Sequence, residues 1–136
     1  MRSRLIFFLL FFPTILAFGQ ACGAKKSVVN VTLGDYTVEL SPATIPAGTP
    51  VKFEITNKGK EDHEFVVEKA DHANKPLTAE VGGKTIKSEI EDIAPGKTVT
   101  LEWTFAEPGS YQVACHIEGH FEAGMKTTFT VTGRRS

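Results

Sequence analysis

Apolar and polar residues alternate along most of the chain from Val28 onward, and this pattern constrains the fold more than any other feature of the sequence. In 99–105, for example, Val, Leu, Trp and Phe alternate with Thr and Glu. A period of two places successive side chains on opposite faces of a β-strand, so each such segment has one buried and one solvent-exposed face. No stretch keeps a period of 3.6 long enough for a substantial helix. Eight segments are therefore predicted to be strands: 28–33, 36–40, 51–56, 64–69, 86–93, 99–105, 111–116 and 128–132.

Turn-forming residues separate these segments, as in Ala94-Pro95-Gly96 and Pro108-Gly109. About eight short strands with regular turns are typical of a β-sandwich, so we predict an all-β fold of this class. The least regular part, 71–84, is predicted to be a long connection with room for one helical turn. A chain of 136 residues has room for one such domain and not for two.

The first 21 residues differ from the rest of the chain. Two arginines precede an apolar stretch, Leu5–Phe18, which is interrupted by a proline and is shorter than the roughly 20 residues that a membrane span requires. This arrangement is typical of an export signal. We therefore predict a signal peptide over 1–21, a short tether over 22–27 and the folded domain over 28–133. The protein is expected to be exported, to a periplasmic or otherwise extracytoplasmic location.

The two cysteines are expected to have separate roles. A disulfide between Cys22 and Cys115 would suit an oxidising compartment, but Cys22 lies at the predicted cleavage site and before the first strand. Its surroundings resemble those of the cysteine that bacterial lipoproteins acylate, although Gly19 stands where leucine is usual. Cleavage after Gly19 by an ordinary signal peptidase is the alternative. We expect contact with the membrane only through a lipid on Cys22.

The charge balance argues against a nucleic-acid partner. The chain has 15 Lys and Arg against 16 Asp and Glu, and no basic run apart from Arg134-Arg135. An enzyme is not expected either, because the sequence shows no Ser/His/Asp triad order and no phosphate-binding loop. We expect a monomer that meets its partners transiently.

The chemically informative segment lies near the C-terminus. Cys115, His120 and Met125 follow the spacing Cys-x4-His-x4-Met. Thiolate, imidazole and thioether are the donors that suit copper. The cysteine ends a predicted strand and the other two lie on the following loop, where Gly119 and Gly124 allow the backbone to turn tightly.

A copper site of this kind needs a second imidazole. His63 is the best candidate, because it stands at the beginning of a predicted strand and not in its middle. His116 is predicted not to be a ligand, since strand alternation puts it on the opposite face from Cys115. His72 lies in the irregular connection, with nothing near it in the sequence to suggest chemistry.

Together these residues resemble the pattern of the cupredoxins, the small blue-copper proteins that include plastocyanins, azurins and rusticyanins. The resemblance covers nearly the whole predicted domain, and the spacing of the loop is most similar to that of the rusticyanins. It implies a Greek-key β-sandwich that binds one copper ion. His63, Cys115 and His120 would be the equatorial ligands and Met125 the axial one. Glu118 departs from the pattern, because many relatives have proline there.

The resemblance implies a one-electron carrier that alternates between Cu(I) and Cu(II) and serves transient redox partners. We expect the electron to leave through His120, with Phe121 in an apolar rim around it. The acidic residues around His63 (Glu61, Asp62 and Glu64) are interpreted as a solvated loop. Two alternatives remain: a protein that binds and delivers copper without an electron-transfer role, and a structural sandwich module with an empty site.

Overall fold

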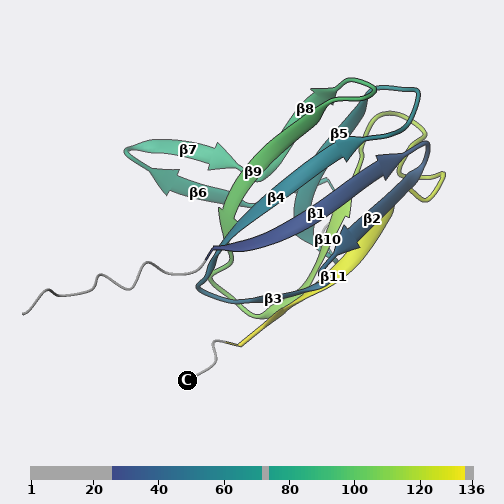
Figure 1. Ribbon diagram of the computed structural model, residues 1–136. Helices are drawn as coiled ribbons and strands as arrows, with labels where there is room; N and C mark the ends of the chain where they lie inside the picture. The colour runs from purple at the N-terminus through teal and green to yellow at the C-terminus, as the bar shows by residue number, and fades with distance from the viewer. Residues whose placement is uncertain (1–25, 72–73, 134–136) are drawn as a thin grey trace, which may run out of the picture.

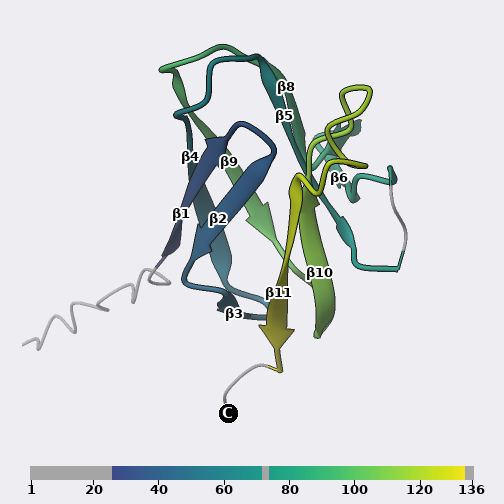
Figure 2. The ribbon, with the colours of Figure 1, turned by 90° about the vertical axis from the view of Figure 1, so that its right-hand side faces the viewer.

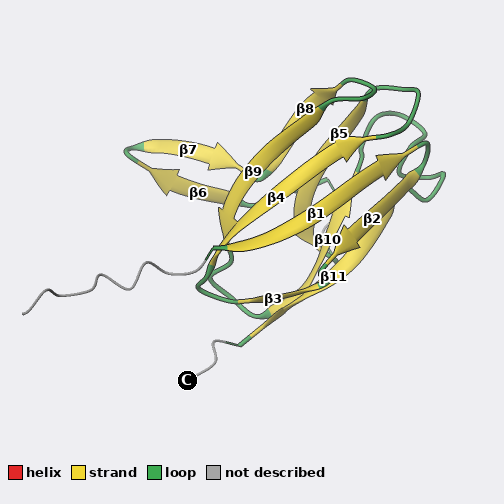
Figure 3. Cartoon of the chain, in the orientation of Figure 1, coloured by secondary structure: helices red, strands yellow, loops and turns green. Residues whose placement is uncertain are grey.

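The computed structural model describes residues 26–71 and 74–133, and it confirms the all-β prediction. The described residues form strands and loops, without any helix long and apolar enough to cross a membrane (Figure 3). The predicted signal peptide, the tether up to Lys25 and Cys22 lie outside the described residues. So does His72.

Eleven strands are present in the described part of the chain: β1 (Ser27–Gly34), β2 (Thr37–Ser41), β3 (Thr44–Pro46), β4 (Pro50–Asn57), β5 (His63–Lys69), β6 (Thr78–Val81), β7 (Lys84–Lys87), β8 (Glu89–Ile93), β9 (Thr98–Thr104), β10 (Gly109–Ala114) and β11 (Lys126–Thr132). One sheet has the order β2-β1-β4-β9 and the other the order β3-β11-β10-β5-β8. The strands β6 and β7 form a separate hairpin. Figures 1 and 2 show the two larger sheets packed face to face, with the hairpin projecting from one side.

Most neighbouring strands come from distant parts of the chain, such as β1 and β4 or β5 and β10, whereas β1–β2 and β10–β11 are consecutive. The pairs β1–β4 and β3–β11 are parallel, whereas the other pairs within the two large sheets are antiparallel. The chain therefore crosses repeatedly from one sheet to the other, and the two sheets share one core.

The core contains a cluster of phenylalanine rings at its centre. Phe53 on β4 lies 5.4 Å from Phe65 and 6.3 Å from both Phe105 and Phe129, measured between ring centroids. Because Phe65 and Phe129 belong to the second sheet, these contacts join the two layers. Tilted and edge-to-face rings at such distances stabilise a core beyond the area they bury. The apolar residues of the alternating segment 51–56, Val51, Phe53 and Ile55, are all fully buried, so the predicted inward face of β4 is confirmed.

The prediction of one strand over 86–93 is wrong, because Ser88 interrupts it. Ser88 is fully buried, and its hydroxyl donates to the carbonyl oxygen of Val67 at 2.6 Å. The same hydroxyl accepts the N–H of Leu77 at 2.8 Å. The side chain thus competes with the strand ladder and separates β7 from β8. The irregular connection predicted over 71–84 is also partly wrong, since it contains β6.

The outer face of β10 is covered, which the alternation did not predict. Gln112 and Ala114 were expected to face solvent, but both are buried. Glu68, on the neighbouring strand, accepts a hydrogen bond from Gln112 at 2.7 Å and another from the N–H of Lys75 at 2.9 Å. The segment before β6 therefore lies over this face, and the second sheet is buried on both sides there.

We expect Phe53→Ala to destabilise the domain by about 3–5 kcal/mol, because it opens a cavity among three other rings. Denaturant unfolding of the metal-free protein measures the loss. Thr100→Ala, on the exposed face of β9, serves as the control and should cost less than about 1 kcal/mol. Equal losses in the two variants would contradict this assignment of the core.

Candidate metal centre

Two neighbouring strands bring the predicted ligands to one end of the five-stranded sheet. The strand β5 begins at His63, and β10 ends at Ala114, directly before Cys115. Because the two strands are antiparallel neighbours, the beginning of β5 lies beside the end of β10. His63 and Cys115 are far apart in the sequence, and they meet here through sheet pairing.

The other neighbour of β5 is irregular next to His63. His63 lies opposite Ile93 on β8, whereas Phe65 lies opposite Ile90, so the register shifts between the two pairs. Asp92 lies within this irregularity and has a left-handed φ of 55°. Bulges of this kind are frequent beside functional sites, where they redirect a side chain. This one lies at the end of β5 that carries the predicted ligand.

The loop after Cys115 folds back on itself. The N–H of Cys115 donates to the carbonyl oxygen of Met125 at 3.1 Å. The N–H of Met125 donates to the carbonyl oxygen of His120 at 3.0 Å. Gly119 and Gly124 have φ values of 85° and 102°, a region that a side chain would strain. The tight turns predicted before the two donors are therefore present.

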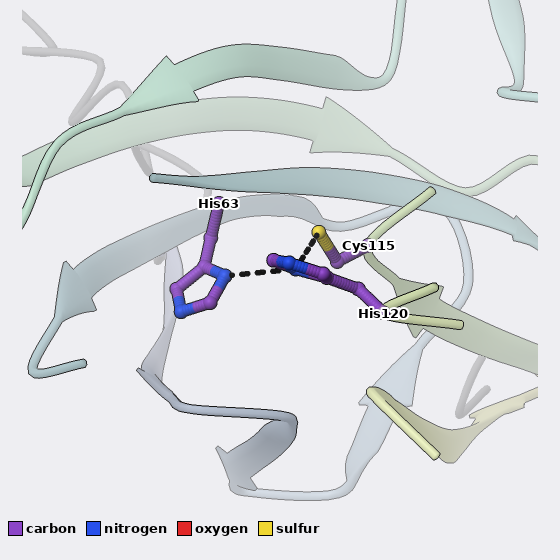
Figure 4. Close-up of side chains that lie close together, drawn as sticks. All are labelled: His63, Cys115 and His120. Atoms are coloured by element: carbon purple, nitrogen blue, oxygen red, sulfur yellow. Dashed lines mark hydrogen bonds between the residues drawn. The ribbon is translucent and has the colours of Figure 1, made fainter. Parts of the chain in front are cut away.

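The donor atoms of three predicted ligands converge at this point (Figure 4). The Nδ1 atoms of His63 and His120 are 3.3 Å apart, and the Sγ of Cys115 is 3.4 Å from the Nδ1 of His120. One donor atom from each of the three residues lies within 4.8 Å of the other two. His63 and Cys115 are fully buried, and His120 is 7% exposed.

The spacing of these donors suits a single metal ion. Bonds of about 2.0 Å to an imidazole nitrogen and about 2.3 Å to a thiolate are usual in protein metal sites. Donors on adjacent corners of a trigonal or tetrahedral site then stand about 3.3–3.7 Å apart. The two measured separations, 3.3 and 3.4 Å, agree with that spacing. Two imidazoles with one thiolate are the equatorial set of a blue-copper site, so the residues fit copper.

Met125, the predicted axial ligand, is fully buried at the end of the same loop. Its backbone is hydrogen-bonded to both Cys115 and His120, so it belongs to the same compact turn. A thioether bonds the metal weakly at the axial position of such sites. The structure thus places all four predicted ligands around one end of the sandwich.

Burial raises the pKa of the Cys115 thiol above its ordinary value. The backbone N–H of Glu64 acts in the opposite direction, since it donates to the sulfur at 3.3 Å and favours the thiolate. The balance leaves Cys115 as a thiol at neutral pH when no metal is bound. A metal ion must therefore displace a proton when it binds.

Burial also lowers the pKa of His63, and the neighbouring His120 lowers it further. The ring is therefore neutral at physiological pH, which is the form that binds metals. Its Nε2 is buried and has no hydrogen-bond partner among the described residues. The nearest carboxylate oxygen, from Asp35, is 4.0 Å away.

The turn before β5 holds the outer side of His63. The buried Asn57 donates to the carbonyl oxygens of Glu61 and Ile93 at 2.8 and 2.7 Å, and it accepts the N–H of Gly59 at 2.8 Å. A Cβ added at Gly59 would lie only 2.8 Å from the Nε2 of His63. Only glycine fits this position without moving a neighbour.

The interpretation of the acidic residues near His63 as a solvated loop holds for Glu61 and Asp62, which are exposed. It is wrong for Glu64, which is partly buried in β5. Even so, Glu61 borders the site. Glu61 approaches the Nε2 of His120 at 3.4 Å. The carboxylate of Glu64 accepts the N–H of His116 at 3.2 Å, in addition to the Glu64 backbone contact with the cysteine sulfur. Tyr36 also borders the site, with its ring edge-on to His120 at 5.2 Å between centroids. Their nearness to His63 in the sequence could have indicated the two glutamates, but nothing in the sequence pointed to Tyr36.

His116, which is predicted not to be a ligand, is not among the three residues whose donor atoms converge. Its Nε2 is 3.1 Å from the Oε1 of Glu68. Phe121, the expected rim residue, packs on the ring of His116, with centroids 5.0 Å apart. Glu118, which stands where many relatives have proline, is exposed on the loop.

Comparison with known proteins places the chain in a family. Residues 5–131 match the family described as "Cupredoxin-like domain", and the chain belongs to it. Among curated proteins, it is 34% identical over 116 residues to "Copper-resistant cuproprotein CopI" of Rubrivivax gelatinosus. That match covers 79% of this chain and 67% of the relative, so the chain spans about two thirds of that protein's length.

Solved structures agree on the fold. Reduced auracyanin from the photosynthetic bacterium Roseiflexus castenholzii has a TM-score of 0.62 at 21% identity, over 81% of this chain and 99% of that one. Rusticyanin from Thiobacillus ferrooxidans has a TM-score of 0.60 at 18% identity, over 79% and 78%. The predicted cupredoxin fold is confirmed. Family membership and the donor set together identify copper as the cofactor.

We expect Gly59→Ala to weaken copper binding by about 10–100-fold, because the new methyl group displaces a ligand ring from behind. A competition titration against a chelator measures the affinity. Gly133→Ala is the matched control, since a Cβ there would meet nothing within 4 Å. Unchanged affinity in Gly59→Ala, with the fold intact by circular dichroism, would show that His63 does not hold the ion.

Proposed function

We propose that the protein is an exported type 1 copper protein that carries single electrons between redox partners. The observation that carries this proposal is the buried convergence of His63, Cys115 and His120. A catalytic metal site keeps an open position for water or substrate. Here the three donors lie under the surface of the sandwich, an arrangement that suits outer-sphere electron exchange. Copper, when bound, supplies one-electron chemistry between Cu(I) and Cu(II).

The chain contributes a fixed set of donors. His63 and Cys115 are anchored at the ends of paired strands, and the loop that carries His120 and Met125 is closed by backbone hydrogen bonds. Donors that move little between the two oxidation states keep the reorganisation small. The backbone N–H of Glu64 supports the sulfur, and hydrogen bonds of this kind tune the reduction potential.

His120 is the ligand through which we propose the electron leaves. Its ring is nearly buried, but its Nε2 approaches Glu61, whose side chain is 53% exposed. The exposed ring of Tyr36 lies against it. A partner docking over these residues would come close to the ligand ring. A small, transient interface below about 1,200 Å² would suffice for such an encounter.

The proposal extends to the partners and the location of the protein. We propose that the protein is not an enzyme, that it is a monomer with transient redox partners, and that it does not bind nucleic acid. We propose a periplasmic or otherwise extracytoplasmic location, with membrane attachment only through a lipid on Cys22. The apolar N-terminal stretch and the absence of a basic run support this reading.

A second function is favoured by the name of the CopI relative. "Copper-resistant cuproprotein CopI" describes a protein of copper resistance, so binding or delivery of copper by the same ligands is the alternative. The two functions make different demands on the site. A carrier retains its ion through many redox cycles, whereas a delivery protein releases Cu(I) readily.

Titration of the purified protein with Cu(II) tests the proposal. We expect an intense visible thiolate-to-copper band in the wild type and its loss in Cys115→Ser. The matched control is Cys22→Ser, which changes the other cysteine and should leave the band unchanged. Voltammetry of the loaded protein should show fast, reversible one-electron cycling. Slow or irreversible cycling, with ready loss of Cu(I) to a chelator, would favour the delivery function.

A further inference from the structure

The residues that follow the three ligands of the loop contact one another. His116 follows Cys115, Phe121 follows His120 and Lys126 follows Met125. The rings of His116 and Phe121 are stacked, with centroids 5.0 Å apart and an angle of 21° between their planes. The ammonium of Lys126 lies 3.8 Å from the centroid of the Phe121 ring.

A buried carboxylate lies at the base of this group. Glu68 on β5 is fully buried, and its Oε1 is 3.1 Å from the Nε2 of His116, which donates to it when the ring proton is on this nitrogen. In the other tautomer the same Nε2 accepts the N–H of Asn74 at 3.2 Å. The Oε1 of Glu68 also accepts a hydrogen bond from Gln112 at 2.7 Å, and the other carboxylate oxygen accepts the N–H of Lys75. A buried carboxylate is costly unless such partners satisfy it, so Glu68 is fixed in place. It therefore gives His116 a rigid support.

We propose that Glu68, His116, Phe121 and Lys126 form an outer brace that positions the metal-binding loop. Each of the last three is the sequence neighbour of one loop ligand, so the brace acts on all three ligands at once. None of the four belongs to the metal-binding group, and they are positioning residues. This inference rests on the proposed copper site but not on the electron-transfer role.

The contacts explain how the brace can hold the loop. Stacked aromatic rings and a cation over a ring face are attractive at these distances. The carboxylate fixes His116, the stacked ring carries that constraint to Phe121, and Lys126 closes the group where the loop enters β11. The loop is exposed at Glu118, Gly119 and 122–124, so little other packing covers it from that side.

The brace also acts before any metal binds. Three of the backbone hydrogen bonds that close the loop have their N–H groups in its second half: Ala123 donates to Gly119, Gly124 to Phe121 and Met125 to His120. These bonds persist only if the loop keeps its turn. Loss of the Phe121 ring should let the turn open more often, which exposes the three amides and loosens the ligands.

Amide hydrogen exchange of the metal-free protein tests this directly. In Phe121→Leu, exchange at Ala123, Gly124 and Met125 should become about tenfold faster, because the stacking and the cation contact are both lost. Phe121→Tyr keeps the ring and should exchange at the wild-type rate. Amides in the core of β4 should not change in either variant.

Copper retention supplies a second readout. The loaded Phe121→Leu protein should lose copper to a chelator about tenfold faster than wild type, and its visible band should shift. Lys126→Gln, which removes only the cation contact of an exposed side chain, should speed loop exchange about threefold. Glu122→Gln, on the same loop but outside the brace, is the control and should change neither rate.

Wild-type exchange at the three amides in both Phe121→Leu and Lys126→Gln would overturn the brace. Should Phe121→Leu fail to fold, Lys126→Gln decides alone. Because exchange is measured without copper, its result stands whatever the voltammetry shows. If the loaded wild-type protein fails to cycle electrons but Phe121→Leu still exchanges faster in the loop, the electron-carrier function is refuted and the brace stands.

Discussion

The antiparallel pairing of β5 with β10 is the constraint on which the rest of the structure depends. Ala114, the last residue of β10, pairs with Val66, three residues after His63. The beginning of β5 and the end of β10 therefore lie at the same end of the sandwich, where His63 and Cys115 meet. The other parts of the site are built around His63 and Cys115. The loop returns His120 and Met125 to it, and the turn before β5 closes it from outside. Because both ligands sit at strand ends, the core fixes their separation.

Much of the fold and of the candidate site could be predicted because the signals were local. Alternation identified the inward face of β4, and the spacing of Cys115, His120 and Met125 within one loop indicated soft metal donors. His63 was predicted to be the second imidazole ligand because it stands at the beginning of a predicted strand. The three-residue group now found in the structure contains His63, Cys115 and His120, while Met125 lies buried beside them.

What the sequence did not reveal depends on contacts between distant segments. Ser88 divides a predicted strand because its hydroxyl meets β5, and no local pattern contains that partner. Gln112 is buried because Glu68 and the segment before β6 cover it. Tyr36 reaches His120 from a turn near the other end of the chain. Alternation reports which face a residue takes, but it cannot report what covers that face.

X-ray absorption of the copper-loaded protein is the most direct test of the central claim, which is that one thiolate and two imidazoles share a single ion. We expect one copper–sulfur bond of about 2.3 Å, the usual length of a metal–thiolate bond, together with two nitrogen donors at about 2.0 Å. The sulfur should disappear in Cys115→Ser. A first shell made only of nitrogen and oxygen in the wild type would contradict the account.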